Sequence, residues 1–132
     1  MEKQKMTKPR ASEVVKARKL AIEAVLPSKV SIMGRTFDVK VMNLKGCAGD
    51  CTVADSLIRI HQAQSVESAK ATLWHEAIHA ALGISGLTEL LEAKNDSLEE
   101  AIVRCIEHAF ADVVNVDKLS ISDKNSLTIS AE

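Results

Sequence analysis

The spacing of apolar and polar residues predicts one helix and several short strands in the N-terminal half of the chain. Apolar residues recur at helical spacing over residues 12–26 until Pro27 ends the pattern, which predicts an amphipathic helix. Residues 30–42 alternate between apolar and polar around a turn at residues 33–35, which is typical of a β-hairpin. Residues 57–60 predict one further short strand.

The segment after this strand predicts a second helix. Ala, Leu and Lys dominate it, and it ends at Leu82, just before Gly83. It begins at Ser65 or Ser68, because either serine would cap the N-terminus of a helix.

A last helix is predicted over residues 98–114, where an apolar stripe recurs at helical spacing. Residues 83–95 connect the two helices and contain a candidate helical turn at residues 88–93. Residues 115–132 are expected to form a polar C-terminal tail. The alternation of strand and helix patterns therefore predicts the α+β class.

The composition fits a folded globular chain and argues against several partner classes. With 132 residues, 46% hydrophobic and 27% charged, the chain matches one domain that buries roughly two thirds of its unfolded surface. A formal net charge of −1 gives no overall electrostatic basis for binding nucleic acid or an anionic membrane. The N-terminus lacks the apolar run of a signal peptide, and no segment has the length of a membrane span, so we expect a cytoplasmic protein.

The three cysteines are too few, and odd in number, for a disulfide framework, which agrees with a reducing compartment. Cys47 and Cys51 are spaced so that they could bind a metal together, but a structural zinc ribbon needs a second ligand pair. The sequence supplies no such pair nearby, so we expect free thiols.

The segment His75-Glu76-Ala77-Ile78-His79 carries the candidate chemistry and lies in the predicted second helix. Residues four apart on a helix project from one face, so His75 and His79 can offer two imidazole nitrogens to one metal ion. Glu76 falls beside them, where its carboxylate could accept a proton from a metal-activated water. The spacing predicts a Zn²⁺ site with Glu76 as the catalytic residue.

A third protein ligand is expected from the last helix, where Glu99 and Glu100 are the candidates. Glu99 lies within the apolar stripe, where a carboxylate without a cation would be costly, and this favours Glu99 as the ligand. Glu100 lies off the stripe, and with Ser97 it has the spacing of a capping box. Glu100 remains the alternative ligand.

The arrangement of these segments resembles the zincin fold, and specifically the small prophage-type members of the ImmA/IrrE-like metallopeptidase group. The matching segments cover the central part of the chain: Asp55–Ile60, Ala71–Ala80 and Glu99–Val103, with Glu107 and His108 further along. The resemblance implies a zinc site formed by His75, His79 and a glutamate of the last helix, with Glu76 as general base. Third-ligand glutamates of related enzymes often precede a small residue, as Glu100 precedes Ala101.

The resemblance also implies a minimal zincin-like domain at residues 30–114. Its sheet would consist of the hairpin and an edge strand at residues 57–60, which could pair with an extended peptide. Residues 1–29 would add a basic tail and the amphipathic helix, and residues 115–132 would follow as the polar tail.

Two functional hypotheses follow from these residues. The leading one is a zinc-dependent metallopeptidase that acts on a peptide or protein substrate. The chain contains no tyrosine to stabilise an oxyanion, so Arg59, His61 or Arg104 would have to do so. The alternative is a non-catalytic regulatory or assembly protein in which zinc ties two helices together, with the basic N-terminus as a possible contact to nucleic acid. A fourth protein ligand would favour the alternative, and an open position would favour the enzyme.

Overall fold

The structure contains one mixed β-sheet and several helices, which confirms the α+β class. It is a computed structural model that describes residues 8, 10–92, 96–110 and 126–129. In chain order the elements are α1 (Ala11–Val25), β1 (Lys29–Ile32), β2 (Arg35–Met42), β3 (Gly49–Thr52), β4 (Leu57–His61), α2 (Val66–Ile84), α3 (Leu87–Glu92), α4 (Asp96–Phe110) and β5 (Ser126–Ile129).

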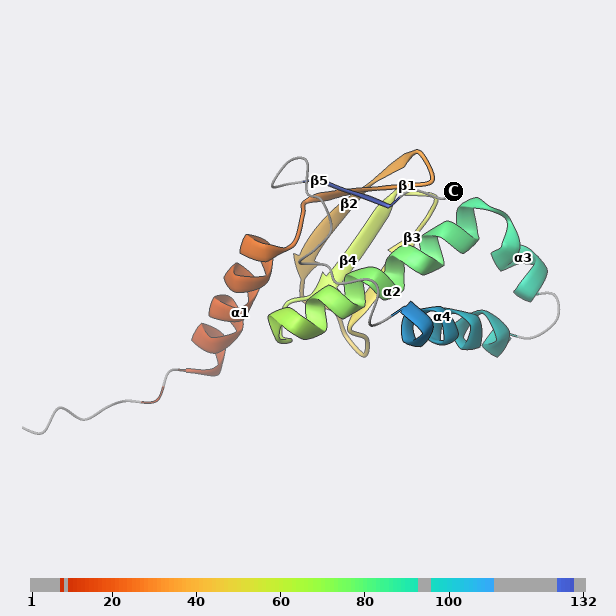
Figure 1. Cartoon of the computed structure of the whole chain (residues 1–132). Coiled ribbons are helices and arrows are strands. Elements are labelled where there is room, and N and C mark those ends of the chain that lie inside the picture. The colour runs from red at the N-terminus through yellow and green to blue at the C-terminus, as the bar shows by residue number, and fades with distance from the viewer. Residues whose placement is uncertain (1–7, 9, 93–95, 111–125, 130–132) are drawn as a thin grey trace, which may run out of the picture.

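The strands form a sheet in the order β3-β4-β2-β1-β5 (Figure 1). The pairs β1/β2 and β3/β4 are antiparallel, whereas β2/β4 and β1/β5 are parallel. The predicted hairpin is confirmed as β1 and β2. Its turn uses Met33 and Gly34, both with positive φ (51° and 81°), as a two-residue type I′ turn requires.

The edge of the sheet nearest α2 differs from the expectation. Residues 57–60 lie in β4, an interior strand between β2 and β3, so their prediction as an edge strand is wrong. The edge strand is β3, which is only four residues long and contains Gly49 and Asp50. Its composition gives no alternation of apolar and polar residues for a sequence pattern to detect.

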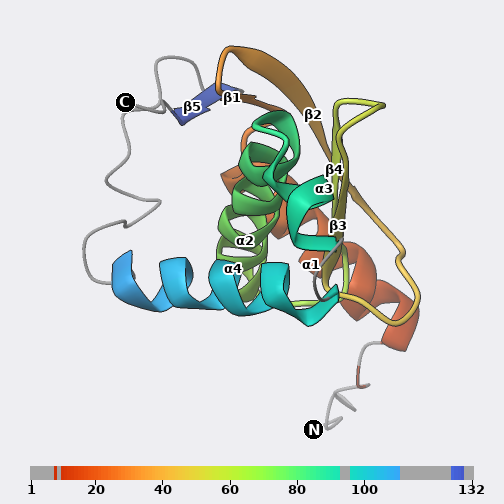
Figure 2. The same ribbon diagram turned by 90° about the vertical axis from the view of Figure 1, so that its right-hand side faces the viewer.

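Part of the predicted C-terminal tail is a strand. Within residues 115–132 the described residues form β5, which pairs with β1 in parallel (Figure 2). Residues 111–114 of the predicted last helix, and most of the predicted basic tail, lie outside the described residues.

Helix α2 runs along one face of the sheet and packs its apolar side into the main core (Figure 1). The largest fully buried side chains of this core come from the sheet, α1 and α2: Phe37, Ile22, Ile32, Ile58, Ile60, Leu73 and Val30. Gly49 lets β3 lie directly against α2, because a Cβ there would be 2.4 Å from Thr72 Cγ2 and 2.8 Å from the Arg59 carbonyl oxygen. The edge strand and the motif helix are therefore in contact at this point.

Helices α3 and α4 both pack against α2 (Figure 2). The α2–α4 contact is a small apolar cluster around Ile78, Leu82 and Val103, with Trp74, Ile102 and Ile106 partly buried against it. This contact fixes which side chains of α4 reach the motif. Among the described residues, no helix combines the length and the apolar character that crossing a membrane requires.

Candidate metal centre

Helix α2 presents the two motif histidines side by side. Its N-cap is Ser65, whose side chain accepts a hydrogen bond from the Ser68 backbone N–H at 3.1 Å, so of the two possible start points the structure has Ser65. The helix is continuous from Val66 to Ile84, and the rings of His75 and His79 stand one turn apart with centroids separated by 4.8 Å.

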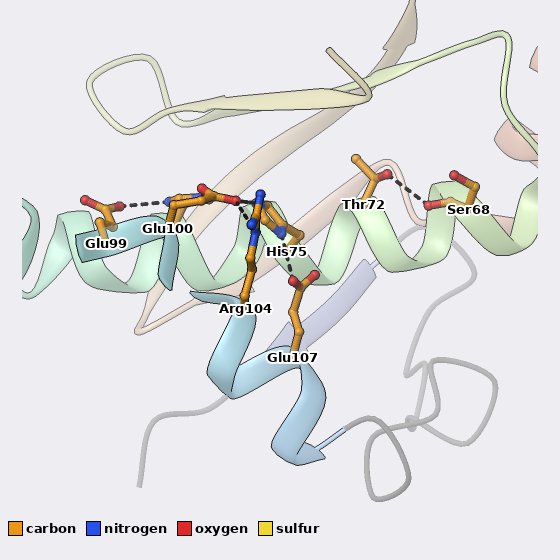
Figure 3. A network of polar contacts seen from close by, with 8 residues as sticks. Ser68, Thr72, His75, Glu99, Glu100, Arg104 and Glu107 are labelled. Carbon is orange, nitrogen blue, oxygen red and sulfur yellow. Dashed lines mark hydrogen bonds and ion pairs between the residues drawn. The ribbon is translucent and has the colours of Figure 1, made fainter. Parts of the chain in front are cut away.

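Three ligand atoms from α2 and α4 converge between the two helices (Figure 3). The Nε2 atoms of His75 and His79 are 3.1 Å apart. One oxygen of Glu100 lies 3.2 Å from His75 Nε2, and the other lies 3.1 Å from His79 Nε2. Zinc bound to imidazole nitrogen in tetrahedral geometry places two ligand atoms about 3.3 Å apart. The separation of the two nitrogens is close to this value, and each nitrogen has one Glu100 oxygen at a similar distance.

The second nitrogen of each imidazole pairs with its own carboxylate from α4. His79 Nδ1 lies 2.8 Å from Glu99, and His75 Nδ1 lies 2.9 Å from Glu107. An ionised carboxylate only accepts hydrogen bonds, so in a neutral imidazole held this way Nδ1 carries the proton and Nε2 is left with a free lone pair. Carboxylates in this position orient metal-binding histidines and make them stronger ligands.

The electrostatics of the His75, His79 and Glu100 cluster favour a bound cation. Two Nε2 lone pairs and the Glu100 carboxylate face one another at hydrogen-bond distance, and all three are acceptors. Such a group is stable only with a shared proton or a metal ion between its members. The residues present therefore fit a divalent metal such as zinc, with two nitrogen ligands and one oxygen ligand.

The two candidate third ligands occupy different positions. Glu99, which the sequence favours, binds the outer nitrogen of His79, whereas Glu100 faces the two inner nitrogens. The geometry thus favours the alternative, Glu100, as the direct ligand. Glu99 is nevertheless the more buried of the two glutamates, since its side chain is 14% exposed against 40% for Glu100. The group that pairs with the buried Glu99 carboxylate is the imidazole of His79.

The charges around the cluster shift two of its pKa values. Burial alone would lower the pKa of His79, but the hydrogen bond to Glu99 and the charges of Glu76 and Glu100 outweigh it and raise that pKa. Burial raises the pKa of Glu76, with a further rise from Asp50 and Glu100, while the two histidines oppose it. Without metal, the site therefore holds protons more tightly than isolated side chains would.

Glu76 lies against Gly49 where β3 meets α2, and the cavities on the two sides of this contact form a cleft. Glu76 and Gly49 together line two cavities, one of about 290 Å³ on the His75 side and one of about 520 Å³ on the His79 side. Glu76 itself is buried, with 8% of its surface exposed. Its carboxylate is thus kept from bulk water yet lies beside a space that another molecule could enter.

The other polar residues singled out in the sequence have separate partners. Arg59 donates to Asp50 through two nitrogens, and the Leu44 backbone N–H donates to His61 Nδ1 at 3.0 Å. His108 is exposed, and Cys47 and Cys51 are free thiols. Within the part of the chain that the structure describes, the His75, His79 and Glu100 group is the one set of side chains with metal-ligand spacing.

Sequence reasoning did not assign a role to Glu107 or to Gly49. The approach of Glu107 to His75 depends on how α4 is rotated against α2, which no local pattern reveals. A signal for Glu107 does exist, because it stands seven residues after Glu100, two helical turns along the same side of α4.

Comparison with known proteins adds no family to this description: the chain matches no family model, and no curated protein or solved structure shows significant similarity to it.

Proposed function

We propose that this protein is a zinc-dependent metallopeptidase with a zincin-like arrangement of its site helices. The observation that carries the proposal is the convergence of His75, His79 and Glu100, whose three ligand atoms, one from each residue, all lie within 4.8 Å of one another. The expected domain at residues 30–114 would contain this site, and Glu76 would be its general base.

The side chains divide the work as follows. A zinc ion bound here would polarise the scissile carbonyl and lower the pKa of the attacking water. The Glu76 carboxylate accepts the proton of that water and later donates it to the leaving amine nitrogen. In the metal-free protein burial raises the pKa of Glu76, which favours the uptake of a proton by its carboxylate. Glu99 and Glu107 hold the two imidazole rings in the ligand orientation.

An extended peptide is the substrate class that the cleft suits. Strand β3 pairs with β4 on one side and ends the sheet on the other, so its outer backbone groups can pair with another strand. Because Gly49 and Glu76 line the same two cavities, a peptide along β3 would pass beside the general base.

The decisive experiment replaces Glu76 with Gln. The variant should keep its zinc content, measured by metal analysis, and lose cleavage of a peptide library followed by mass spectrometry, by a factor of about 10²–10⁴. Glu23→Gln, a matched change on α1 far from the motif, should leave cleavage unaltered. Equal cleavage by the Glu76→Gln and parent proteins would contradict the mechanism.

A non-catalytic zinc protein is the second candidate, and one observation favours it. The apolar contact between α2 and α4 is small, so a metal shared by His75, His79 and Glu100 would also fasten α4 to the rest of the molecule. An exchangeable ligand at the fourth position of the bound metal would favour the enzyme, and a fourth protein ligand would favour this alternative.

A further inference from the structure

Peptide hydrolysis at this site requires a donor for the negative charge that develops on the substrate oxygen. Water adds its oxygen to the carbonyl carbon and gives a proton to Glu76, and the carbonyl π electrons move onto the carbonyl oxygen. When the carbon–nitrogen bond then breaks, the amine nitrogen takes the proton from Glu76. A charged donor beside the oxygen lowers the barrier to both steps.

Two of the three side chains that could supply this donor are engaged elsewhere. Arg59 lies on β4 with its guanidinium bound to Asp50, the residue opposite it on β3. His61 uses its Nδ1 as an acceptor for the Leu44 backbone N–H. The chain has no tyrosine, and neither Arg59 nor His61 lines the two cavities beside Glu76.

Arg104 lines neither cavity either, but of the three it is the residue that contacts the metal centre. It follows Glu100 by one turn of α4, and its Nε is 3.7 Å from the same Glu100 oxygen that faces His75. Figure 3 shows its side chain extending from α4 towards Glu100 and His75. Arg59, by contrast, pairs with Asp50 on β3.

The environment of Arg104 is suited to binding an added anion. Its side chain is 70% exposed, so it contributes little to packing, and Glu100 is the one carboxylate with which the structure pairs it. The contact to Glu100 uses Nε, which leaves the two terminal nitrogens of the guanidinium available. Four glutamates surround the centre (Glu76, Glu99, Glu100 and Glu107), so Arg104 supplies local positive charge to a strongly acidic site.

We infer that Arg104 is a further catalytic residue of this site and donates hydrogen bonds to the tetrahedral oxyanion of the substrate. This inference rests on the proposed peptidase function. It also accounts for an arginine at this point of α4, since a planar guanidinium donates two parallel hydrogen bonds to an oxyanion.

The test is a binding measurement that needs no natural substrate. The full-length protein is loaded with Co²⁺, whose visible spectrum reports ligands entering the metal's open position, and is titrated with methylphosphonate or with imidazole. Methylphosphonate copies the tetrahedral oxyanion, whereas imidazole is an uncharged ligand that needs no second donor. Arg104→Met should weaken methylphosphonate binding about 10- to 100-fold and leave imidazole binding within about two-fold.

Two further variants separate a directed hydrogen bond from general charge. Arg104→Lys should restore part of the methylphosphonate affinity, and Arg18→Met, an equal loss of charge on the exposed surface of α1, should change neither titration. Equal methylphosphonate affinity in the Arg104→Met and parent proteins would overturn the inference, as would the same loss in Arg18→Met. Absence of methylphosphonate binding to the Co²⁺-loaded parent would overturn it as well.

Failure of the underlying function gives a different pattern. If the protein binds no stoichiometric Co²⁺, or binds Co²⁺ but neither added ligand, the peptidase proposal falls and the role of Arg104 falls with it. If Co²⁺ and imidazole bind while methylphosphonate binding is independent of Arg104, the open metal site stands and only the role of Arg104 is wrong.

Discussion

The two helices that form the metal centre are held in place in different ways. Helix α2 buries nine of its residues, and its apolar side belongs to the main core beneath the sheet. Helix α4 has one fully buried side chain among those described, Val103, and touches α2 through a small apolar cluster. The remaining links between the helices are the contacts of Glu99, Glu100 and Glu107 with the two histidines.

The imidazoles and the carboxylates of the metal centre are therefore positioned by different parts of the molecule. The core fixes the backbone of His75 and His79 whether or not metal is bound, because they lie on a helix that the sheet already holds. The glutamates depend on the docking of α4, to which a shared metal ion would add binding free energy. Metal binding should therefore be coupled to the position of α4 far more than to that of α2.

The largest effect is expected from the core under α2. Leu73→Ala should lower the free energy of unfolding by about 2–5 kcal/mol, because Leu73 is fully buried between α2 and the sheet. Val103→Ala on α4 should cost about 1–2 kcal/mol, since fewer carbons are removed from a smaller cluster. Denaturant unfolding of both variants measures the two values, and an equal loss would contradict the proposed difference between the helices.

Next in size is the loss of a direct ligand from α4. Glu100→Gln should reduce zinc affinity by more than about 100-fold, a larger loss than the removal of an outer carboxylate causes. Competition with a zinc chelator measures the affinity. If Glu99→Gln weakened zinc binding more than Glu100→Gln, then Glu99 would be the ligand after all.

The outer carboxylates should have an intermediate effect. Glu99→Gln and Glu107→Gln should each weaken zinc binding about 10- to 100-fold, because each frees one imidazole ring. The same chelator competition applies, with Glu23→Gln on the exposed side of α1 as a matched control that should bind zinc as the parent does. Unchanged zinc affinity in Glu107→Gln would show that His75 needs no orienting partner.

A smaller effect is expected in the pH dependence of zinc stabilisation. The ordinary pKa of histidine is 6.5, and that of His79 is raised in the folded protein. The charged form therefore stabilises the metal-free fold below pH 6.5, and this contribution is lost as the pH rises through the raised pKa. Zinc requires the neutral ring, so the Tm difference between zinc-loaded and chelator-treated protein should grow from pH 6 to pH 8 by about a few degrees. A difference that shrinks over this interval would contradict the shift.

The smallest effect concerns the thiols beside the cleft. Burial, reinforced by Glu76 and Asp50, raises the pKa of Cys51 to about 12, whereas Cys47 and Cys105 are exposed. At pH 8, iodoacetamide should therefore label Cys47 and Cys105 and leave Cys51 unmodified in the folded protein. Peptide mapping by mass spectrometry locates the label, and unfolding in denaturant should make all three cysteines reactive. Labelling of Cys51 at the rate of Cys47 would place it outside the β3–α2 contact.

Local sequence determined the hairpin, the long helices and the chemistry of the motif that one of these helices carries. Alternation around Met33 and Gly34 specified the hairpin, because positive φ at both positions suits a two-residue turn. The four-residue spacing of His75 and His79 placed both rings on one face of a helix without reference to the rest of the fold.

Tertiary structure alone decided which partners these side chains meet. Strand β3 is defined by its pairing with β4 and by its close approach to α2 at Gly49, neither of which a four-residue polar segment signals. The roles of Glu99 and Glu100 follow from how α4 is rotated against α2, which the packing of Val103 and its neighbours sets. Adjacent residues on a helix point about 100° apart, so this rotation decides which carboxylate faces the inner nitrogens and which the outer one.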